Sequence, residues 1–440
     1  MHDGVSGLWS RLSVLEQDIA TLFLLVLPAI LLGIFLQRGY ATGPLTWGLI
    51  RRYSRVCVTF VALIAVSVAL GTGLISQERA LRSGTASAAA PFDLIVAAPG
   101  SEMTAMLAAV YLQPARVRLV DGTIYDRVAR HESVTLAAPI AFGDSFEGRP
   151  VVGTTTAFVD HLSGGLAEGR AFRRIDEAIA GARAKIDIGA AFAPAHGHGD
   201  AAVDGAHGDF TYTVVGRMSE TGSPWDTAIL VPVESVWEIH GLANGHGPDW
   251  GGRLGPPFEP TAFPGTPAII VTADSLAAIY SLRSEFSTDT TMAFLPGAVL
   301  ARLHALLGDV REVMSIMAIV TQGLVAVAVL AGLMILSRLV SRQLALLAAL
   351  GAPNRFVLAV IWGTSATLIL TGALLGMGLG VWAADIIGRI VSTRTDIDVS
   401  ATLGWSEVHL VAGFASTTIL FALVPALFIT RREIVDDLRS

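Results

Sequence analysis

The sequence predicts a multi-span α-helical membrane protein that carries one large extracytoplasmic α+β domain. Three observations lead to this fold class. Of the 440 residues, 52% are hydrophobic and only 15% are charged, whereas soluble domains carry about 25% charged residues. Several apolar runs are long enough to cross a bilayer as helices. The long stretch 76–312 separates two of these runs and contains short segments rich in Val, Ile and Thr.

Five segments qualify as membrane spans, because a bilayer core about 30 Å thick requires about 20 apolar residues in a helix. They are 19–36, 56–75, 313–336, 356–382 and 408–429. The first is the shortest and contains Pro28. Glu16 and Asp18 precede it, which is the wrong charge for the leading region of a signal peptide. We therefore expect 19–36 to be a retained span.

Arginines favour one orientation, because loops on the cytoplasmic side carry an excess of positive side chains. Three segments hold the relevant arginines: the loop 37–55, the loop 337–355 and the tail 430–440. The tail 1–18, the domain 76–312 and the loop 383–407 are then predicted to lie outside. The contrast is modest, since four arginines flank the spans on the outer side: Arg79, Arg82, Arg302 and Arg311.

The outer domain is predicted to mix strands and helices. Its Val/Ile/Thr-rich runs predict strands over 92–98, 115–120, 134–142, 150–158, 210–218, 227–232 and 267–273. Helices are expected over 101–112, 233–240, 274–286 and 298–310. We expect Ser101 and Asp274 to cap two of these helices by accepting a bond from a free N–H group at the helix start.

A histidine-rich stretch, "HGHGDAAVDGAHGDF" (196–210), leaves two interpretations open. Imidazole and carboxylate ligands suit Zn²⁺, but their spacing here fits no fixed zinc motif. A solvated, low-complexity insertion is the other interpretation. The candidate metal ligands are His196, His198, Asp200, His207 and Asp209. His240 and His246, in a later loop, are further candidates.

The chain is predicted not to be an enzyme. Its only lysine, Lys185, lies in "GARAKIDIG", which lacks the G-x-x-x-x-G-K-[ST] pattern of an ATP-binding P-loop. The only cysteine, Cys57, lies in an apolar run, so no disulfide or cysteine-based metal site can form within the chain. No catalytic motif occurs, and the net charge of −7 argues against a nucleic-acid partner.

Two short segments are expected to be helices on the cytoplasmic side. The first, "RQLALLAALGAPNRF" (342–356), is apolar on most faces, so in water it needs a partner groove. Gly351 and Pro353 should end it. The second, "GPLTWGLIRRYSRV" (43–56), is amphipathic and predicted to lie at the membrane interface. Its interfacial residues are Trp47, Arg51, Arg52 and Arg55.

The order of these segments resembles that of MacB/FtsX-type permeases of ABC transporters. Their signature at the first cytoplasmic helix is roughly R-E-[IL]-x-[IL]-[LM]-[RK]-A-[LI]-G-A. The matching residues are Arg342, Leu344, Leu346, Leu347, Ala349, Leu350, Gly351 and Ala352. Gln343 replaces the acidic residue and Ala348 the basic one, so docking should depend on apolar contact more than on ion pairs.

Two outer stretches resemble one branch of this family. They are "FDLIVAAPGSEMTAMLAAVYLQPA" (92–115) and "YTVVGRMSETGSPWDTAILVPVESVWEIHG" (212–241). The family commonly shows four spans, so 19–36 would be an extra one. The helix 43–56 resembles the elbow helix that precedes the first family span.

The resemblance implies a permease subunit in a bacterial inner membrane with its large domain in the periplasm. Such a subunit transmits motion from a separate P-loop ATPase, which binds ATP and Mg²⁺, to a lipoprotein, lipid, peptide or metal-related client. It would be a homodimer among membrane lipids. The ATPase-coupling residues would be Arg342, Gln343, Leu344, Leu346, Leu347, Leu350, Gly351, Ala352 and Arg355. A signalling or scaffold subunit without transport is the alternative, and an intramembrane enzyme is disfavoured.

Overall fold

The computed structural model describes residues 12–197, 210–306, 308–339, 343, 346–347 and 350–430. The chain forms two compact units. The helical unit comprises Met1–Leu81, Asp309–Gly388 and Ser400–Ser440. The sheet domain comprises Arg82–Gly308 and Arg389–Val399.

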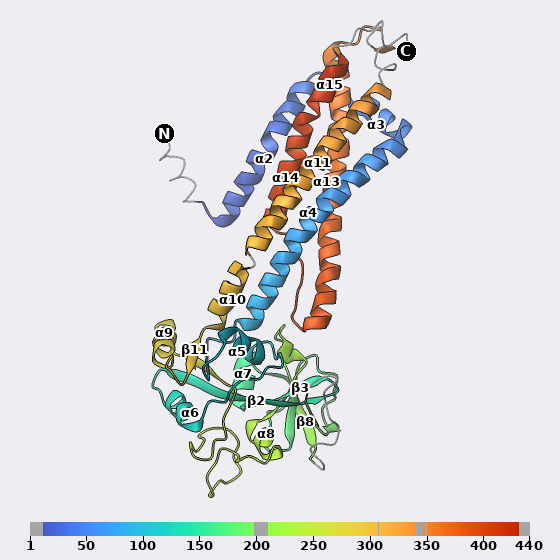
Figure 1. The fold of residues 1–440 in the computed structure, drawn as a ribbon. Helices are drawn as coiled ribbons and strands as arrows, with labels where there is room; N and C mark the ends of the chain where they lie inside the picture. The colour runs from blue at the N-terminus through green and yellow to red at the C-terminus, as the bar shows by residue number, and fades with distance from the viewer. Residues whose placement is uncertain are drawn as a thin grey trace. The chain divides into compact units, whose positions relative to one another are not determined.

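Helices, most of them long, make up the described part of the helical unit (Figure 1). They are α2 (Val14–Gln37), α3 (Gly43–Arg52), α4 (Ser54–Ala89), α11 (Gly308–Leu339), α13 (Asn354–Thr395), α14 (Trp405–Phe421) and α15 (Leu423–Thr430). Within the described part of the chain, four helical stretches are long and apolar enough to cross a membrane: Val14–Gln37, Ser54–Ala89, Asn354–Thr395 and Trp405–Leu427. The apolar stretch found in α11, Ile319–Ile335, is shorter, so a fifth span over 313–336 stays a prediction.

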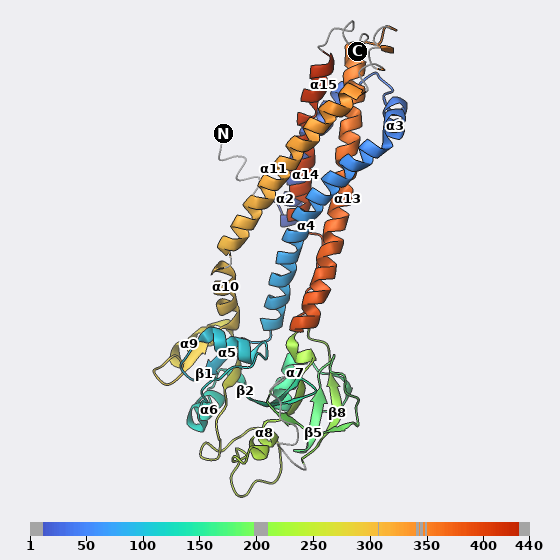
Figure 2. The ribbon, with the colours of Figure 1, turned by 45° about the vertical axis from the view of Figure 1, so that its right-hand side comes forward.

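Glycines bring α4 and α13 into close contact, and the two helices run side by side in both views (Figures 1 and 2). A methyl group on Gly372 would lie 2.7 Å from Ile64, and one on Gly376 or Gly380 would lie 2.6 or 2.7 Å from a backbone oxygen of α4. These three glycines recur every four residues and therefore share one helix face. Small residues let helix backbones approach closely in lipid, so tight packing explains these three glycines of the predicted span 356–382.

The helix α13 is longer than the predicted span. It continues to Thr395 and covers about half of the segment 383–407 that was expected to be a loop. Residues 383–395 contain neither proline nor a helix-ending glycine pair, and Gly388 alone does not interrupt the helix. The last part of α13 therefore belongs to the sheet domain, which includes Arg389–Val399.

The sheet domain contains a mixed sheet of eleven strands among the described residues. They are β1 (Leu94–Ala97), β2 (Val134–Phe146), β3 (Arg149–Thr154), β4 (Leu166–Gly169), β5 (Glu177–Ala180), β6 (Ala191–Phe192), β7 (Ala195–His196), β8 (Tyr212–Met218), β9 (Ile229–Pro232), β10 (Ala268–Ala273) and β11 (Met292–Phe294). The main order is β11-β1-β10-β2-β3-β9-β5-β8-β4, with β7 paired to β2 and β6 to β8. The long strand β2 connects the two halves, because its first part pairs with β10 and its last part with β3 and β7.

Helices lie between these strands in the sequence, and one more, α10, follows the last strand. They are α5 (Glu102–Ala109), α6 (Gly122–Ala129), α7 (Thr156–Ser163), the short 3₁₀ helix η2 (Pro224–Asp226), α8 (Val233–Ile239), α9 (Leu276–Glu285) and α10 (Pro296–Leu306). The buried apolar core beside them includes Trp225, whose indole N–H donates to the Val110 carbonyl at 3.1 Å. Tyr212 is equally buried and shares a 2.8 Å hydrogen bond with Ser235.

The structure corrects several sequence-based expectations. Residues 115–120 form no strand apart from a single bridge at Val120. Ala115 and Leu119 are exposed, so the apolar face of this alternating segment does not pack against the sheet. The cap of α9 is Ser275, not Asp274, since the Ser275 hydroxyl accepts the bond from Ala278 N. Short elements were also missed: α6, α7, β4, β5, β6, β7 and β11. The prediction for Ser101 is confirmed, because its hydroxyl accepts a bond from Thr104 N.

Candidate functional site

The predicted coupling helix ends in a closed backbone turn. Leu346 and Leu347 are helical, and the amide of Leu350 donates to the Leu346 carbonyl at 3.0 Å. The amide of Ala352 donates to the Leu347 carbonyl at 3.0 Å, and Gly351 has φ +95°. A bond spanning five residues around a left-handed glycine is a Schellman motif, which satisfies the last carbonyls of a helix. Glycine and Pro353 therefore stop this helix as predicted.

The segment presents two different faces. Leu347 packs into a small cluster whose buried members are Val357, Ile361 and Ala426. On the other face, the side chains of Leu346 and Leu350 are 52% and 85% exposed. Residues four apart share a helix face, so these two leucines form one exposed apolar pair. We refer to Gln343, Leu346, Leu347 and residues 350–355 as the coupling segment; Arg342 and Leu344 lie outside the described residues.

The predicted interfacial helix is α3, and it supports the coupling segment. Leu49 of α3 packs against the same cluster as Leu347, and so does Tyr53, the first residue after α3. The Gln343 amide also donates to the Tyr53 hydroxyl at 3.4 Å. Gln343, which departs from the family signature, thus contacts the chain itself.

The arginines of this region divide into two groups. Arg51 and Arg52, in the last turn of α3, are exposed, as are Arg55 and the indole of Trp47. Arg355, at the start of α13, lies over the ring of Phe35 at 4.7 Å from the ring centre and donates to the Phe35 carbonyl. The structure therefore places Arg355 against α2.

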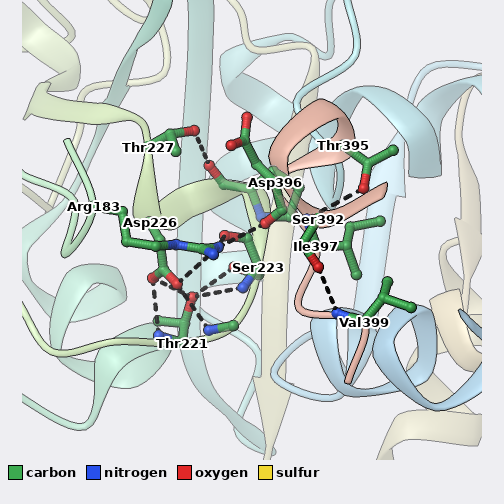
Figure 3. A network of polar contacts seen from close by, with 12 residues as sticks. Arg183, Thr221, Ser223, Asp226, Thr227, Ser392, Thr395, Asp396, Ile397 and Val399 are labelled. Atoms are coloured by element: carbon green, nitrogen blue, oxygen red, sulfur yellow. Dashed lines mark hydrogen bonds and ion pairs between the residues drawn. The ribbon is translucent and has the colours of Figure 1, made fainter. Parts of the chain in front are cut away.

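A polar junction lies within the sheet domain between residues 221–227 and residues 392–399 (Figure 3). Arg183 connects them: one guanidinium nitrogen donates to the Asp396 carbonyl at 2.8 Å and lies 3.4 Å from the Asp226 carboxylate. The second segment continues directly from α13. The residues that follow α13 are thus hydrogen-bonded within the sheet domain, to which they belong.

Asp226 organises its own side of the polar junction. Its carboxylate is fully buried and accepts bonds from the Thr221 amide and hydroxyl and from the Gly222 amide, at 2.7–2.9 Å. The Gly222 carbonyl in turn accepts the Asp398 amide at 3.0 Å. A side chain at Gly84, near the end of α4, would collide with the Asp398 carbonyl. Three separate parts of the chain therefore meet at this point.

Sequence reasoning missed the residues of the polar junction. The stretch "TGSPWD" (221–226) lies within a segment that resembles one branch of the family, but no motif in it predicts a role for Asp226. Arg183 and Asp396 lie 213 positions apart in the chain. No local pattern marks either one, so only the folded structure relates them.

A cluster of one carboxylate and two imidazoles lies elsewhere in the sheet domain. Asp144 is on β2, His196 is on β7, and His240 ends α8. Asp144 Oδ1 lies 3.4 Å from His196 Nδ1 and 3.5 Å from His240 Nε2, and the two imidazole nitrogens are 3.3 Å apart. We call these three residues the His–Asp cluster. Among the described residues, it is the group able to offer three donors to a metal ion.

Of the five predicted metal ligands, the structure describes only His196. His196 belongs to the His–Asp cluster, joined by Asp144, which sequence reasoning did not select. The other four predicted ligands lie outside the described residues: His198, Asp200, His207 and Asp209. His246 is not part of the cluster, because it lies 3.3 Å from Glu234 and stacks on Trp250. Burial raises the pKa of the Glu234 carboxyl.

Comparisons with known proteins leave the family undecided. No model of a protein family matches this chain, and no curated protein matches it. A matching solved structure is the extracellular domain of the noncanonic ABC-type transporter YknZ from Gram-positive bacteria, with 12% identity and a TM-score of 0.28. That match covers 46% of this chain and 98% of the other. A likeness this distant carries no argument about fold or function.

Proposed function

We propose that this chain is the permease-type subunit of an ABC-type transporter and transmits ATP-driven motion to its sheet domain. One observation carries the proposal: α13 begins beside the exposed leucines of the coupling segment and ends in the polar junction. A single helix thereby connects a candidate docking surface with a hydrogen-bonded attachment to the sheet domain.

The exposed leucines support a partner at the coupling segment. Leu346 and Leu350 lie at a well-terminated helix end whose other face is already packed through Leu347. Covering two leucine side chains with a partner removes apolar surface from water, worth about 1.5–3 kcal/mol for each fully buried side chain. The chain has no P-loop of its own, so the proposed partner is a separate ATPase that binds ATP and Mg²⁺.

The polar junction favours a mechanism in which the chain transmits motion over one in which a client passes between the helices. α13 is one continuous helix from Asn354 to Thr395. Of the residues that follow it, Asp398 donates its amide to the Gly222 carbonyl, and Asp396 accepts a hydrogen bond from Arg183, which also pairs with Asp226. Displacing the start of α13 would then displace residues of the sheet domain without a gap in the connection.

The proposal extends to the surroundings of the chain. The four apolar helices are proposed to cross a bacterial inner membrane, with the sheet domain in the periplasm. A homodimer and a periplasmic lipoprotein, lipid, peptide or metal-related client complete the proposed assembly.

Co-purification with a candidate P-loop ATPase from the source genome tests the coupling segment. The variant Leu346→Asp places a carboxylate where the apolar contact would form, and an unpaired charge in such a contact is costly. We expect at least about tenfold weaker binding, equivalent to about 1.4 kcal/mol, and a matching loss of stimulated ATP hydrolysis.

A matched control is Leu276→Asp, since Leu276 of α9 is similarly exposed, at 66%, but lies in the sheet domain. It should bind the ATPase as the unmodified chain does. Equal binding by Leu346→Asp and Leu276→Asp would refute the assignment of the coupling segment.

A further inference from the structure

The donor atoms of the His–Asp cluster match one face of a tetrahedral metal site. Zinc binds imidazole nitrogen and carboxylate oxygen at about 2.0–2.1 Å, so the tetrahedral angle places neighbouring donor atoms about 3.3–3.4 Å apart. The three edges in the structure are 3.3, 3.4 and 3.5 Å. We propose that Asp144, His196 and His240 together bind a divalent transition-metal ion of the Zn²⁺ class.

The orientation of His240 supports this assignment. Its Nδ1 lies 2.7 Å from the Val236 carbonyl, one turn earlier in α8. A carbonyl only accepts hydrogen bonds, so Nδ1 is the donor in this contact, and Nε2 is the ring nitrogen that faces Asp144 and His196. Metal-binding histidines typically donate their second ring N–H to a carbonyl or carboxylate, which fixes the ring and its tautomer.

The backbone holds the other two ligands in register. Asp144 of β2 lies directly opposite His196 of β7 in their antiparallel pair. Beyond this pair, the Gly197 amide donates to the Gly143 carbonyl at 2.8 Å, and the Ser145 hydroxyl donates to the Gly197 carbonyl at 2.6 Å. The positions of the two ligands are thus fixed by strand pairing.

Gly143 keeps the third ligand within reach. A methyl group at this position would lie 3.3 Å from His240 Nε2, closer than most carbon contacts. The absence of a side chain therefore allows the imidazole of His240 to approach Asp144 across the strand.

The donor set also indicates which ions fit. Two imidazoles and one carboxylate suit Zn²⁺ and its neighbours, whereas Ca²⁺ and Mg²⁺ prefer oxygen ligands alone. Asp144 is 1% exposed, His240 23% and His196 53%, so the cluster lies between the interior and the surface. His196 and Gly143 also line a cavity of about 560 Å³, which gives an ion and a fourth, exchangeable ligand such as water a route to the cluster.

A zinc titration of the full-length chain in lipid nanodiscs, after removal of metal with a chelator, tests the site. We expect one high-affinity equivalent by calorimetry. Replacing Zn²⁺ with Co²⁺ should give the visible absorption bands of a four-coordinate ion. Even outer partners of a metal site are worth about 10–100-fold in affinity, so loss of a ligand in Asp144→Asn or His240→Ala should weaken binding at least about 100-fold.

The control variant is His131→Ala, which removes an imidazole of the sheet domain that pairs with Glu285; its affinity for Zn²⁺ should equal that of the unmodified chain. Circular dichroism checks that each variant folds. If a substitution at a buried ligand prevents folding, His196→Ala, at the most exposed ligand, is the variant to measure. If Asp144→Asn, His196→Ala and His240→Ala all retain full affinity, the ion is held elsewhere, for example by the histidines of residues 198–209, and the proposal is wrong. Absence of any zinc binding by the unmodified chain would overturn it equally.

Discussion

The two ends of α13 differ in chemistry. At its start, the coupling segment exposes two leucines, and residues 342–356 contain no acidic residue or histidine. At its end, the polar junction buries Asp226 completely and surrounds it with hydrogen-bond donors. One end therefore offers an uncovered apolar surface, and the other forms a satisfied polar contact within the same chain.

This difference corresponds to two kinds of attachment. Apolar contact is non-directional and roughly proportional to the area removed from water, which suits a partner that binds and changes its conformation. A buried carboxylate with several directed donors fixes one geometry, and removing a member is costly. We infer that the first end is adapted to a separate partner and the second to a permanent attachment.

The largest expected effect comes from breaking the polar junction. Asp226→Ala leaves Arg183 and two backbone amides without their carboxylate, and each buried donor left unsatisfied costs about 1–3 kcal/mol. Hydrogen exchange at the Asp398 amide should accelerate strongly. The control Asp176→Ala removes an exposed pair with Arg174 and should change stability by less than about 1 kcal/mol. Similar exchange in both variants would show that the junction is not a fixed attachment.

A second prediction concerns acid stability of the sheet domain. Hydrogen bonds from the Arg170 guanidinium, the largest cause, lower the pKa of Glu177 from its ordinary 4.5 to about 2. Because the folded-state pKa is lowered, this stabilisation is complete above pH 4.5 and is lost as the pH falls toward 2. Hydrogen bonds to a charged group contribute about 1.5–3 kcal/mol. The unfolding temperature of Glu177→Gln should therefore change less between pH 5 and 2 than that of the unmodified chain.

The matched control for this acid effect is Glu147→Gln, at a carboxylate whose side chain is 63% exposed and paired with Arg149. Thermal unfolding followed by circular dichroism at each pH measures the difference. If Glu147→Gln reduced the pH dependence of unfolding as much as Glu177→Gln does, the assignment of this acid effect to Glu177 would be wrong.

A smaller effect is expected at the end of the coupling helix. Gly351 has φ +95°, where an L-residue is strained by about 1–2 kcal/mol. Gly351→Ala should weaken ATPase binding by distorting the turn that positions Leu350. The control Gly297→Ala, in open space and without a positive φ, should leave binding unchanged.

The smallest effect on stability is expected for a variant of Leu350, which distinguishes a role in docking from a role in folding. Leu350 is 85% exposed, so Leu350→Ser should change the free energy of unfolding by no more than about 0.5 kcal/mol. It should nevertheless reduce stimulated ATP hydrolysis in the same assay as Leu346→Asp. A large loss of stability with unchanged ATPase binding would mean that Leu350 is a structural residue.

Local patterns account for much of what could be predicted. Four of the five predicted spans coincide with described helices that are long and apolar enough to cross a membrane, and the Gly-Pro stop predicted the end of the coupling helix. The strands over 92–98 and 267–273 were predicted from their Val and Ile content. The strands β4 to β7 were missed, because each has two to four residues and none contains the Val- and Ile-rich run that predicted β1, β9 and β10. The helix α7 was missed because its first residues fall within the predicted strand 150–158.

By itself, the sequence determined the apolar helices, the terminated coupling helix and the absence of a P-loop, since each depends on residues close together in the chain. Only the tertiary structure decided that Arg183 meets Asp396, and that Asp144 and His196 meet His240. Those encounters depend on the register of β7 against β2 and on where α13 ends. Strand register shifts every side chain when it changes by one residue, and pairing between distant strands leaves no local mark in the sequence.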